Sequence, residues 1–148
     1  MKTIITDEKD ERFHKLVREL DNGYYQRIGE GLSKYDKYNS LETPHVVILL
    51  MDSNEGVACA SYRVLNKNSV EFKRVYVKKE YRRKGIAFKL IKKLELDAIE
   101  KGFKQSYIIT GKNNTSAIRL YEKLNYHIIP NVEEFKDDKI VLSMKKDF

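Results

Sequence analysis

The sequence has one cysteine, no tryptophan and no long run of apolar residues. Because Cys59 cannot form an internal disulfide, cysteine usage fits a reducing compartment, and we expect a cytoplasmic protein. Cys59 lies between two alanines, so we interpret it as a small buried residue rather than a nucleophile. No apolar run approaches the roughly 20 residues that a membrane helix needs, and we expect no membrane partner. The residues after Met1 also lack the layout of a secretory signal, and we expect none.

The sequence also lacks the motifs that would assign a chemistry at once. No segment ends in Gly-Lys-Ser/Thr as a P-loop does, and none has the three glycines of the dinucleotide-binding fingerprint. The three histidines, His14, His45 and His127, are scattered without the spacing of metal ligands, so we interpret them as structural or exposed. We therefore expect no metal site.

Positive charge, in contrast, is in excess and unevenly distributed. The formal net charge is +7, with 9 Lys/Arg against 11 Asp/Glu in residues 1–66 and 20 against 11 in residues 67–148. Basic residues are dense between Lys73 and Lys84. This asymmetry favours an anionic partner such as a nucleic acid, a membrane surface or a polyphosphorylated cofactor, although solvated surface charges would give the same count.

The length of 148 residues, with 41% hydrophobic and 34% charged residues, fits one globular domain. The first forty residues have a helical pattern, and we expect the first helix to end at Gly23. Its apolar face is formed by Phe13, Leu16, Val17 and Leu20. A second, weaker helical stretch is expected from about Tyr24 to Tyr38.

After Pro44 the pattern changes to strands, which we expect at 46–51, 57–64 and 69–77. In the third strand the apolar residues change parity, from the even positions of Val70 and Phe72 to the odd positions of Val75 and Val77. Because side chains of a strand alternate between faces, the change requires an extra residue, and we predict a β-bulge near Lys73–Arg74. A bulge also frees backbone groups to face a ligand.

The second half continues with an amphipathic helix that ends at Gly102. Its predicted apolar face is formed by Ile86, Leu90, Ile91, Leu94, Ala98 and Ile99. A short strand at 107–110 completes a strand–helix–strand unit, which we expect to be parallel. A further helix begins after a cap at 113–116, and strands at 126–129 and 140–145 follow. The sequence therefore predicts an α/β domain with a mixed sheet.

The segment between the bulged strand and the amphipathic helix reads Arg82-Arg83-Lys84-Gly85-Ile86-Ala87. A helix start offers unpaired backbone N–H groups and the positive end of a dipole, both of which suit a phosphate. Gly85 and the small Ala87 allow close approach of a ligand to the backbone. The segment therefore indicates an anion-binding turn.

In this context the sequence resembles the GNAT acetyltransferase superfamily. Its first signature, Arg/Gln-x-x-Gly-x-Gly/Ala, is found here as Arg82-x-x-Gly85-x-Ala87, after a strand of similar sequence at 71–77. The segment 114–126 is similar to the second signature, Asn-x-x-Ala-x-x-x-Tyr-x-x-x-Gly-Phe/Tyr, with Asn125 in place of glycine. Asparagine can take the left-handed cap conformation. The resemblance covers about residues 46–145.

The resemblance implies a mostly antiparallel sheet with a splayed, bulged central strand and flanking helices. It implies an N-acetyltransferase that transfers an acetyl group from acetyl-CoA to a primary amine of a small molecule or peptide. Dimers are common in the family, so it also allows a homodimer. We expect one domain over 1–148, with a helical acceptor-side region at 1–44, a cofactor-binding core at 45–129 and a C-terminal loop and strand at 130–148.

The same resemblance assigns the cofactor contacts. Backbone groups of the strand Val75-Tyr76-Val77 would bind the pantetheine arm, as though it were an added strand. The pyrophosphate would be wrapped by Arg82, Arg83, Lys84, Gly85, Ile86 and Ala87. Asn114 would contact the arm, and Tyr121 would approach the sulfur. A backbone N–H near Val75 would stabilise the oxyanion.

Two residues are candidates for proton transfer. Glu71 is the candidate general base, directly or through a water, and its alternative is an ion pair with Lys73 or Arg74, or simple exposure. Tyr121 is the candidate general acid for the departing thiolate, and its alternative is a core aromatic.

The acceptor is not identified by the sequence. Four tyrosines could line its pocket or could be ordinary packing: Tyr24, Tyr25, Tyr35 and Tyr38. An acidic loop could attract a cationic amine or could simply be solvated. It contains Glu133, Glu134, Asp137 and Asp138.

Two other functions stay open. A CoA-binding domain without catalysis would bind CoA but acetylate no amine. A nucleic-acid-binding module would use the basic second half, but that half has no recognised binding signature, and we expect no nucleic-acid partner.

Overall fold

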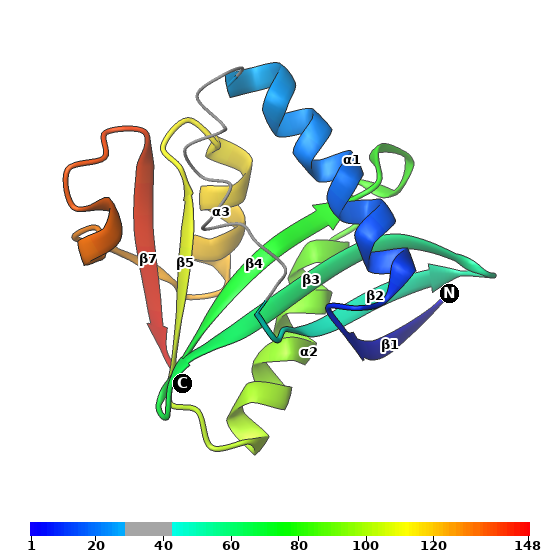
Figure 1. The fold of residues 1–148 in the computed structure, drawn as a ribbon, viewed down its shortest axis with the longest axis horizontal. Helices are drawn as coiled ribbons and strands as arrows, with labels where there is room; N and C mark the ends of the chain where they lie inside the picture. Colours follow the sequence, from blue (N-terminus) through cyan, green and yellow to red (C-terminus); the bar gives the residue numbers. More distant parts are fainter. Residues whose placement is uncertain (29–42) are drawn as a thin grey trace.

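A seven-stranded sheet forms the centre of the structure, a computed structural model that describes residues 1–28 and 43–148 (Figure 1). The strands are β1 (Lys2–Asp7), β2 (Val46–Asp52), β3 (Glu55–Asn66), β4 (Ser69–Val77), β5 (Gln105–Gly111), β6 (His127–Ile129) and β7 (Val141–Asp147). They lie in the order β1-β2-β3-β4-β5-β7-β6. Every neighbouring pair is antiparallel except β4 and β5, which are parallel. The predicted mixed, mostly antiparallel α/β fold is confirmed.

Helices cover both faces of this sheet. They are α1 (Glu11–Ile28), α2 (Ile86–Glu100) and α3 (Thr115–Lys123), with single 3-10 turns η2 (Lys79–Tyr81) and η3 (Glu133–Phe135). Helix α1 lies on one face, and α2 and α3 lie on the other (Figure 1). Within residues 1–28 and 43–148, no helix has both the length and the apolar character needed to cross a bilayer.

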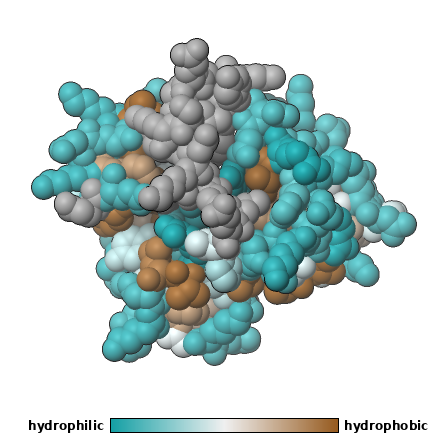
Figure 2. All heavy atoms as spheres, viewed as in Figure 1, coloured by the Kyte–Doolittle hydropathy of each residue, from teal (hydrophilic) through white to brown (hydrophobic). Residues whose placement is uncertain are grey.

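Strand β3 shows how one sheet carries two cores. Its residues 57–62 are all buried, because helices pack on both faces. The side chains of Ala58, Ala60 and Tyr62 belong to the larger core with α2 and α3. Cys59 points the other way, into the smaller core under α1, as expected for a small buried residue. The face seen in Figure 2 is mostly hydrophilic, with hydrophobic side chains in separate patches.

The prediction for the first forty residues is partly wrong. Residues Lys2–Asp7 form an edge strand, which pairs with β2 along its whole length. Ile5 of this strand is 53% exposed, so β1 lacks the regular alternation that marks a strand in sequence. Helix α1 also continues through Gly23 to Ile28. A glycine inside a helix costs only about 1 kcal/mol, which the burial of Phe13 and Leu16 against the sheet offsets.

The weaker helix predicted from Tyr24 to Tyr38 overlaps the end of α1, and the rest of it lies outside the described residues. The side chains of the four tyrosines considered for the acceptor pocket also lie outside what the structure describes.

Helix α2 follows the predicted pattern with one exception. The predicted face packs on the sheet, but Ile99 is 46% exposed and not part of the core. Glu95 is buried instead, because its carboxylate accepts hydrogen bonds from the Tyr126 hydroxyl at 3.1 Å and from Lys146 Nζ at 3.1 Å. Gly102 ends the helix as predicted, with a φ of 92°. The predicted parallel strand–helix–strand unit is confirmed by β4, α2 and β5.

Candidate functional site

The register of β4 against β3 changes at Arg74. Cys59 pairs with Tyr76, but Ser61 pairs with Lys73, so β4 has one extra residue between these two pairs. Arg74 has a φ of 56°, in the left-handed region, and its carbonyl accepts a hydrogen bond from Cys59 Sγ at 3.3 Å. The predicted β-bulge near Lys73–Arg74 is therefore confirmed.

The bulge sorts the side chains of β4 onto two faces. Val70 and Phe72 before it, and Val75 and Val77 after it, all pack on the core side of α2. Tyr76 packs on the opposite face, in the core under α1. Because side chains alternate along a strand, Glu71 and Lys73 also face the α1 side.

The two parallel strands diverge next to this bulge. Strands β4 and β5 pair only from Ser69 to Phe72 and from Gln105 to Ile108. Beyond these pairs, β4 pairs with β3 alone and β5 pairs with β7 alone, and Figure 1 shows β4 and β5 separating. Among the described residues, the edge of β4 at Val75–Val77 therefore has no strand partner on the β5 side. An extended ligand could bind along this edge by main-chain hydrogen bonds.

The turn after β4 leads into an exposed helix start. Arg82 Nε donates a hydrogen bond to the Val77 carbonyl at 2.8 Å, and its guanidinium lies 5.6 Å from the ring centroid of Tyr76. Arg83 and Gly85 both have left-handed backbone, with φ of 65° and 73°. Gly85 is the N-cap of α2 and offers no capping side chain. The first-turn N–H groups and the positive dipole end therefore point to an open, basic surface that suits an anion.

Helix α3 carries Asn114 at its start and places Tyr121 in the core. Asn114 is its N-cap, and its Oδ1 accepts a hydrogen bond from the Ala117 N–H at 3.3 Å. Tyr121 is only 6% exposed and lies edge-to-face with Tyr126, with 6.3 Å between ring centroids. Asn125 has a φ of 71°, so it adopts the left-handed conformation that we expected where the signature has glycine.

Glu71 lies in a buried charge cluster on the α1 side of the sheet. It is only 2% exposed and forms an ion pair with Arg63, the residue directly opposite on β3, with 2.9 Å between Oε1 and Nε. Its other oxygen, Oε2, has no hydrogen-bond partner among the described residues. The alternative that Glu71 is simply exposed is wrong, because its side chain is buried. The alternative of an ion pair with Arg74 is also wrong, because Arg74 pairs with Asp21 of α1 and Glu71 pairs with Arg63.

Burial dominates the electrostatics of this cluster. It raises the pKa of the Glu71 carboxyl, which the positive charge of Lys73 lowers in part and the negative charge of Glu134 raises further. Burial likewise lowers the pKa of the Lys73 amine, which is 7% exposed. Glu134 belongs to the predicted acidic loop, so this loop lies within electrostatic reach of the cluster.

His45 lies at the margin of this cluster. It is 4% exposed, and its Nδ1 donates a hydrogen bond to the Thr43 carbonyl at 2.6 Å. Its Nε2 has no partner among the described residues. Burial lowers the pKa of His45, the hydrogen bond to Thr43 opposes this in part, and the charges of Lys73 and Arg63 lower the pKa further. Of the two alternatives given for His45, exposure is wrong, and a structural role is consistent with this buried, hydrogen-bonded placement.

Sequence reasoning did not single out Arg63 or His45. The short interval between the strands predicted at 57–64 and 69–77 contains the signal for Arg63, because a hairpin there brings Arg63 opposite Glu71. No motif marks His45, whose position depends on the packing of β2 beside β3.

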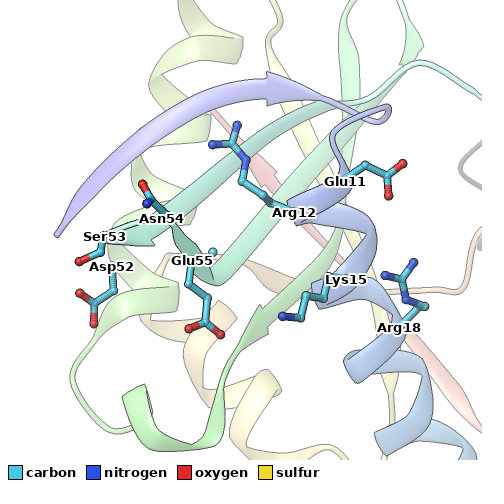
Figure 3. A pocket seen from close by; sticks show the side chains of 9 residues that line it. Glu11, Arg12, Lys15, Arg18, Asp52, Ser53, Asn54 and Glu55 are labelled. Atoms are coloured by element: carbon cyan, nitrogen blue, oxygen red, sulfur yellow. The ribbon is translucent and has the colours of Figure 1, made fainter.

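A separate groove lies between the start of α1 and the β2–β3 turn (Figure 3). Its volume is about 750 Å³. Its lining residues are Glu11, Arg12, Lys15, Arg18, Asp52, Ser53, Asn54, Glu55 and Gly56. The side chain of Lys15, on α1, points toward that of Glu55, on β3 (Figure 3). This groove contains none of the residues predicted to bind a cofactor.

Comparisons with known proteins agree with this geometry. The model of the acetyltransferase (GNAT) family matches residues 11–126. No curated protein sequence gives a match.

Solved structures share the fold over most of the chain. A Klebsiella pneumoniae protein, provisionally assigned as an acyl-CoA N-acyltransferase, is 24% identical, with 98% of this chain and 97% of that chain covered and a TM-score of 0.78. The PaiA N-acetyltransferase of Thermoplasma acidophilum, in complex with coenzyme A, is 19% identical over 100% of both chains, with a TM-score of 0.76. A GNAT family acetyltransferase of Elizabethkingia anophelis with acetyl-CoA bound is 20% identical over 81% of this chain and 84% of that chain, with a TM-score of 0.63.

Proposed function

The chain belongs to the acetyltransferase (GNAT) family, and on that premise we propose that it transfers an acetyl group from acetyl-CoA to a primary amine of a small molecule or peptide. The observation that carries this proposal is the divergence of β4 from β5 directly beside the bulge and the uncapped start of α2. Together they provide a strand edge for an extended arm and a helix N-terminus for a phosphate.

The residues present fit acetyl-CoA. One structurally similar acetyltransferase has acetyl-CoA bound, and another is in complex with coenzyme A. The backbone of Val75-Tyr76-Val77 would bind the pantetheine arm. The segment from Arg82 to Ala87 would surround the pyrophosphate, and Asn114 would contact the arm. When bound, acetyl-CoA supplies an activated acetyl thioester.

The chain's own residues then move protons and hold charge. Glu71, whose Oε2 has no hydrogen-bond partner in the described part of the chain, would take a proton from the acceptor amine, directly or through a water. Arg63 holds the other carboxylate oxygen and thereby fixes its orientation. A backbone N–H near Val75 would stabilise negative charge on the carbonyl oxygen. Tyr121, on α3, would donate a proton to the leaving sulfur.

The domain layout is part of the same proposal. Residues 45–129 would bind the cofactor, residues 1–44 would form the acceptor side, and residues 130–148 would complete the site. Glu134 supports a contribution from this last segment, since its charge affects both Glu71 and Lys73. The cytoplasmic location, the homodimer and the absence of a nucleic-acid partner stay predictions.

Isothermal titration of acetyl-CoA and of free CoA into the protein tests this function first. We expect both to bind, and a screen of amines should then find one that releases thiol from acetyl-CoA. Binding without turnover on any amine would favour a non-catalytic CoA-binding domain. Lack of binding to either compound would overturn the proposal, and salt-dependent binding to an oligonucleotide would then favour the basic module.

A further inference from the structure

Lys73 occupies a special position in β4. It is the first residue beyond the parallel pairing with β5, which ends at Phe72 and Ile108. It is also the last residue before the bulge at Arg74. Its backbone is fixed, because its carbonyl accepts a hydrogen bond from Ser61 Oγ at 2.8 Å. The strand therefore holds this lysine where the two strands begin to separate.

The side chain of Lys73 lies in the buried charge cluster. It is on the same face of β4 as Glu71, two residues earlier, and only 7% of it is exposed. Its amine interacts electrostatically with Glu71 and Glu134, and with the like charges of Arg63 and Arg74. A lysine amine thus lies within electrostatic reach of the carboxylate that we propose as the base.

We propose that Lys73 is a modification site, at which the protein acetylates its own lysine amine from acetyl-CoA when no acceptor is present. This inference rests on the proposed function, since it uses the same cofactor and the same base. The acceptor in it is an amine that the fold itself places beside the separating strands.

The reaction balances with the groups already described. The lone pair of Lys73 Nζ forms a bond to the acetyl carbon while the carbon–sulfur bond breaks, and the electron pair of that bond goes to sulfur. Glu71 takes a proton from Nζ through a water, and the sulfur receives a proton from Tyr121 or from water. The products are an acetyl-lysine amide and CoA. Burial lowers the pKa of Lys73, which increases the neutral, nucleophilic fraction of its amine.

Acetylation would leave the protein in a less active state. The amide carries no charge, so it would no longer lower the pKa of Glu71, and this carboxyl would be protonated to a larger extent. The added acetyl group would also occupy space beside the base. We therefore expect the modified protein to acetylate added amines more slowly.

The test is incubation of the full chain with acetyl-CoA and no amine, followed by intact mass measurement and peptide mapping. We expect a gain of one acetyl group per chain, located at Lys73, and excess free CoA should suppress it. A second sample without acetyl-CoA is labelled sparingly with acetic anhydride, which reports the chemical accessibility of each lysine. In that sample the buried Lys73 should be labelled less than the exposed Lys92 of α2.

The two labelling orders decide the proposal. Acetyl-CoA should reverse the order, with Lys73 acetylated ahead of Lys92. If both reagents acetylate exposed lysines first, or if Lys73 stays unmodified while acetyl-CoA binds, the proposal is overturned.

Variants add an independent measurement. Lys73→Arg should abolish the acetyl gain, the matched Lys92→Arg should leave it unchanged, and Glu71→Gln should slow it by at least about tenfold. Should Lys73→Arg fail to fold, the peptide map of the unaltered chain still decides. Failure of this inference and failure of the proposed function are distinguishable. In the first case acetyl-CoA binds and an added amine is acetylated without modification of Lys73. In the second case acetyl-CoA does not bind.

Discussion

At the scale of single residues, Glu71 combines near-complete burial with one oxygen paired to Arg63 and one that has no partner within residues 1–28 and 43–148. Burial raises its pKa to about 7, and the charged groups that face it are Arg63 from β3, Lys73 from β4 and Glu134 from η3. A base must be deprotonated to act, so kcat/KM should rise as pH increases through about 7 and then level off.

Glu71→Gln should lower this rate by about 100-fold and flatten its pH dependence, because the amide cannot accept a proton. The measurement is kcat/KM against pH for both proteins. Stability supplies the control. Because the pKa of Glu71 is raised in the folded protein, its protonated carboxyl stabilises the fold at low pH, and this contribution is lost as pH rises through about 7. The free energy of unfolding of the variant should therefore vary less with pH. A variant with an unchanged pH–rate profile would remove Glu71 from the mechanism.

Tyr121 and Tyr126 form a matched pair of buried tyrosines on and after α3. The hydroxyl of Tyr126 is committed to structure, since it donates a hydrogen bond to the Glu95 carboxylate at 3.1 Å and accepts one from the Ser106 hydroxyl at 2.7 Å. Tyr126→Phe should therefore lower the free energy of unfolding by roughly 1–3 kcal/mol. Tyr121→Phe should lower kcat by about 100-fold and leave the affinity for acetyl-CoA unchanged, as expected for a proton donor.

Steady-state kinetics and urea denaturation of both variants separate these roles. Unchanged kcat in Tyr121→Phe would assign this tyrosine to the core, which was the alternative left open by the apolar helix face.

At the scale of elements, the start of α2 is exposed and offers a position, Gly85, at which an added side chain meets no neighbouring atom. A Cβ built on Gly85 would meet no atom within 4 Å, but the φ of 73° disfavours any residue other than glycine. Gly85→Ala should therefore cost about 1 kcal/mol of stability, and Gly85→Asp should cost a similar amount.

Their effects on acetyl-CoA binding should differ. Aspartate adds a negative charge beside the proposed pyrophosphate position, and we expect its Kd to rise by more than tenfold over that of Gly85→Ala. Titration calorimetry of the two folded variants gives the comparison. Equal Kd values for alanine and aspartate would place the phosphates elsewhere.

Elements also differ in how much of them the sequence reveals. The bulge in β4 could be predicted because a change of parity in four apolar residues has one simple cause, an extra residue. Strand β1 could not, since it is short and at the sheet edge, and exposed Ile5 obscures its alternation. Helix α1 passes through Gly23 because tertiary packing exceeds a propensity cost of about 1 kcal/mol.

At the scale of the whole molecule, the family could be recognised because its two signatures are local, at 82–87 and 114–126, and the comparison over 11–126 confirms it. The buried charge cluster is different. It joins Arg63 and Glu71, which lie in one hairpin, with Glu134, which is distant in sequence. The hairpin indicates that Arg63 lies near Glu71, but the exact register and the position of η3 could be identified only from the structure.

The uneven charge leads to a prediction for the whole protein. A ligand that binds only the folded state stabilises it by about 2.7 kcal/mol at a concentration of 100 times Kd. Acetyl-CoA should therefore raise the melting temperature in one cooperative transition. Arg82, Arg83 and Lys84 are exposed, so salt should screen their attraction for the phosphates. At fixed acetyl-CoA, the shift should become smaller as salt increases.

An acetylated pantetheine without phosphates is the matched control for this melting experiment. It retains the arm that would bind along β4 but lacks the groups that the basic turn would hold. Its smaller shift should depend little on salt. If the two compounds show the same salt dependence, the basic turn does not bind the phosphates. If an oligonucleotide stabilises the protein and acetyl-CoA does not, the positive charge of residues 67–148 serves a nucleic acid, because that partner would engage the charge without using the opening between β4 and β5.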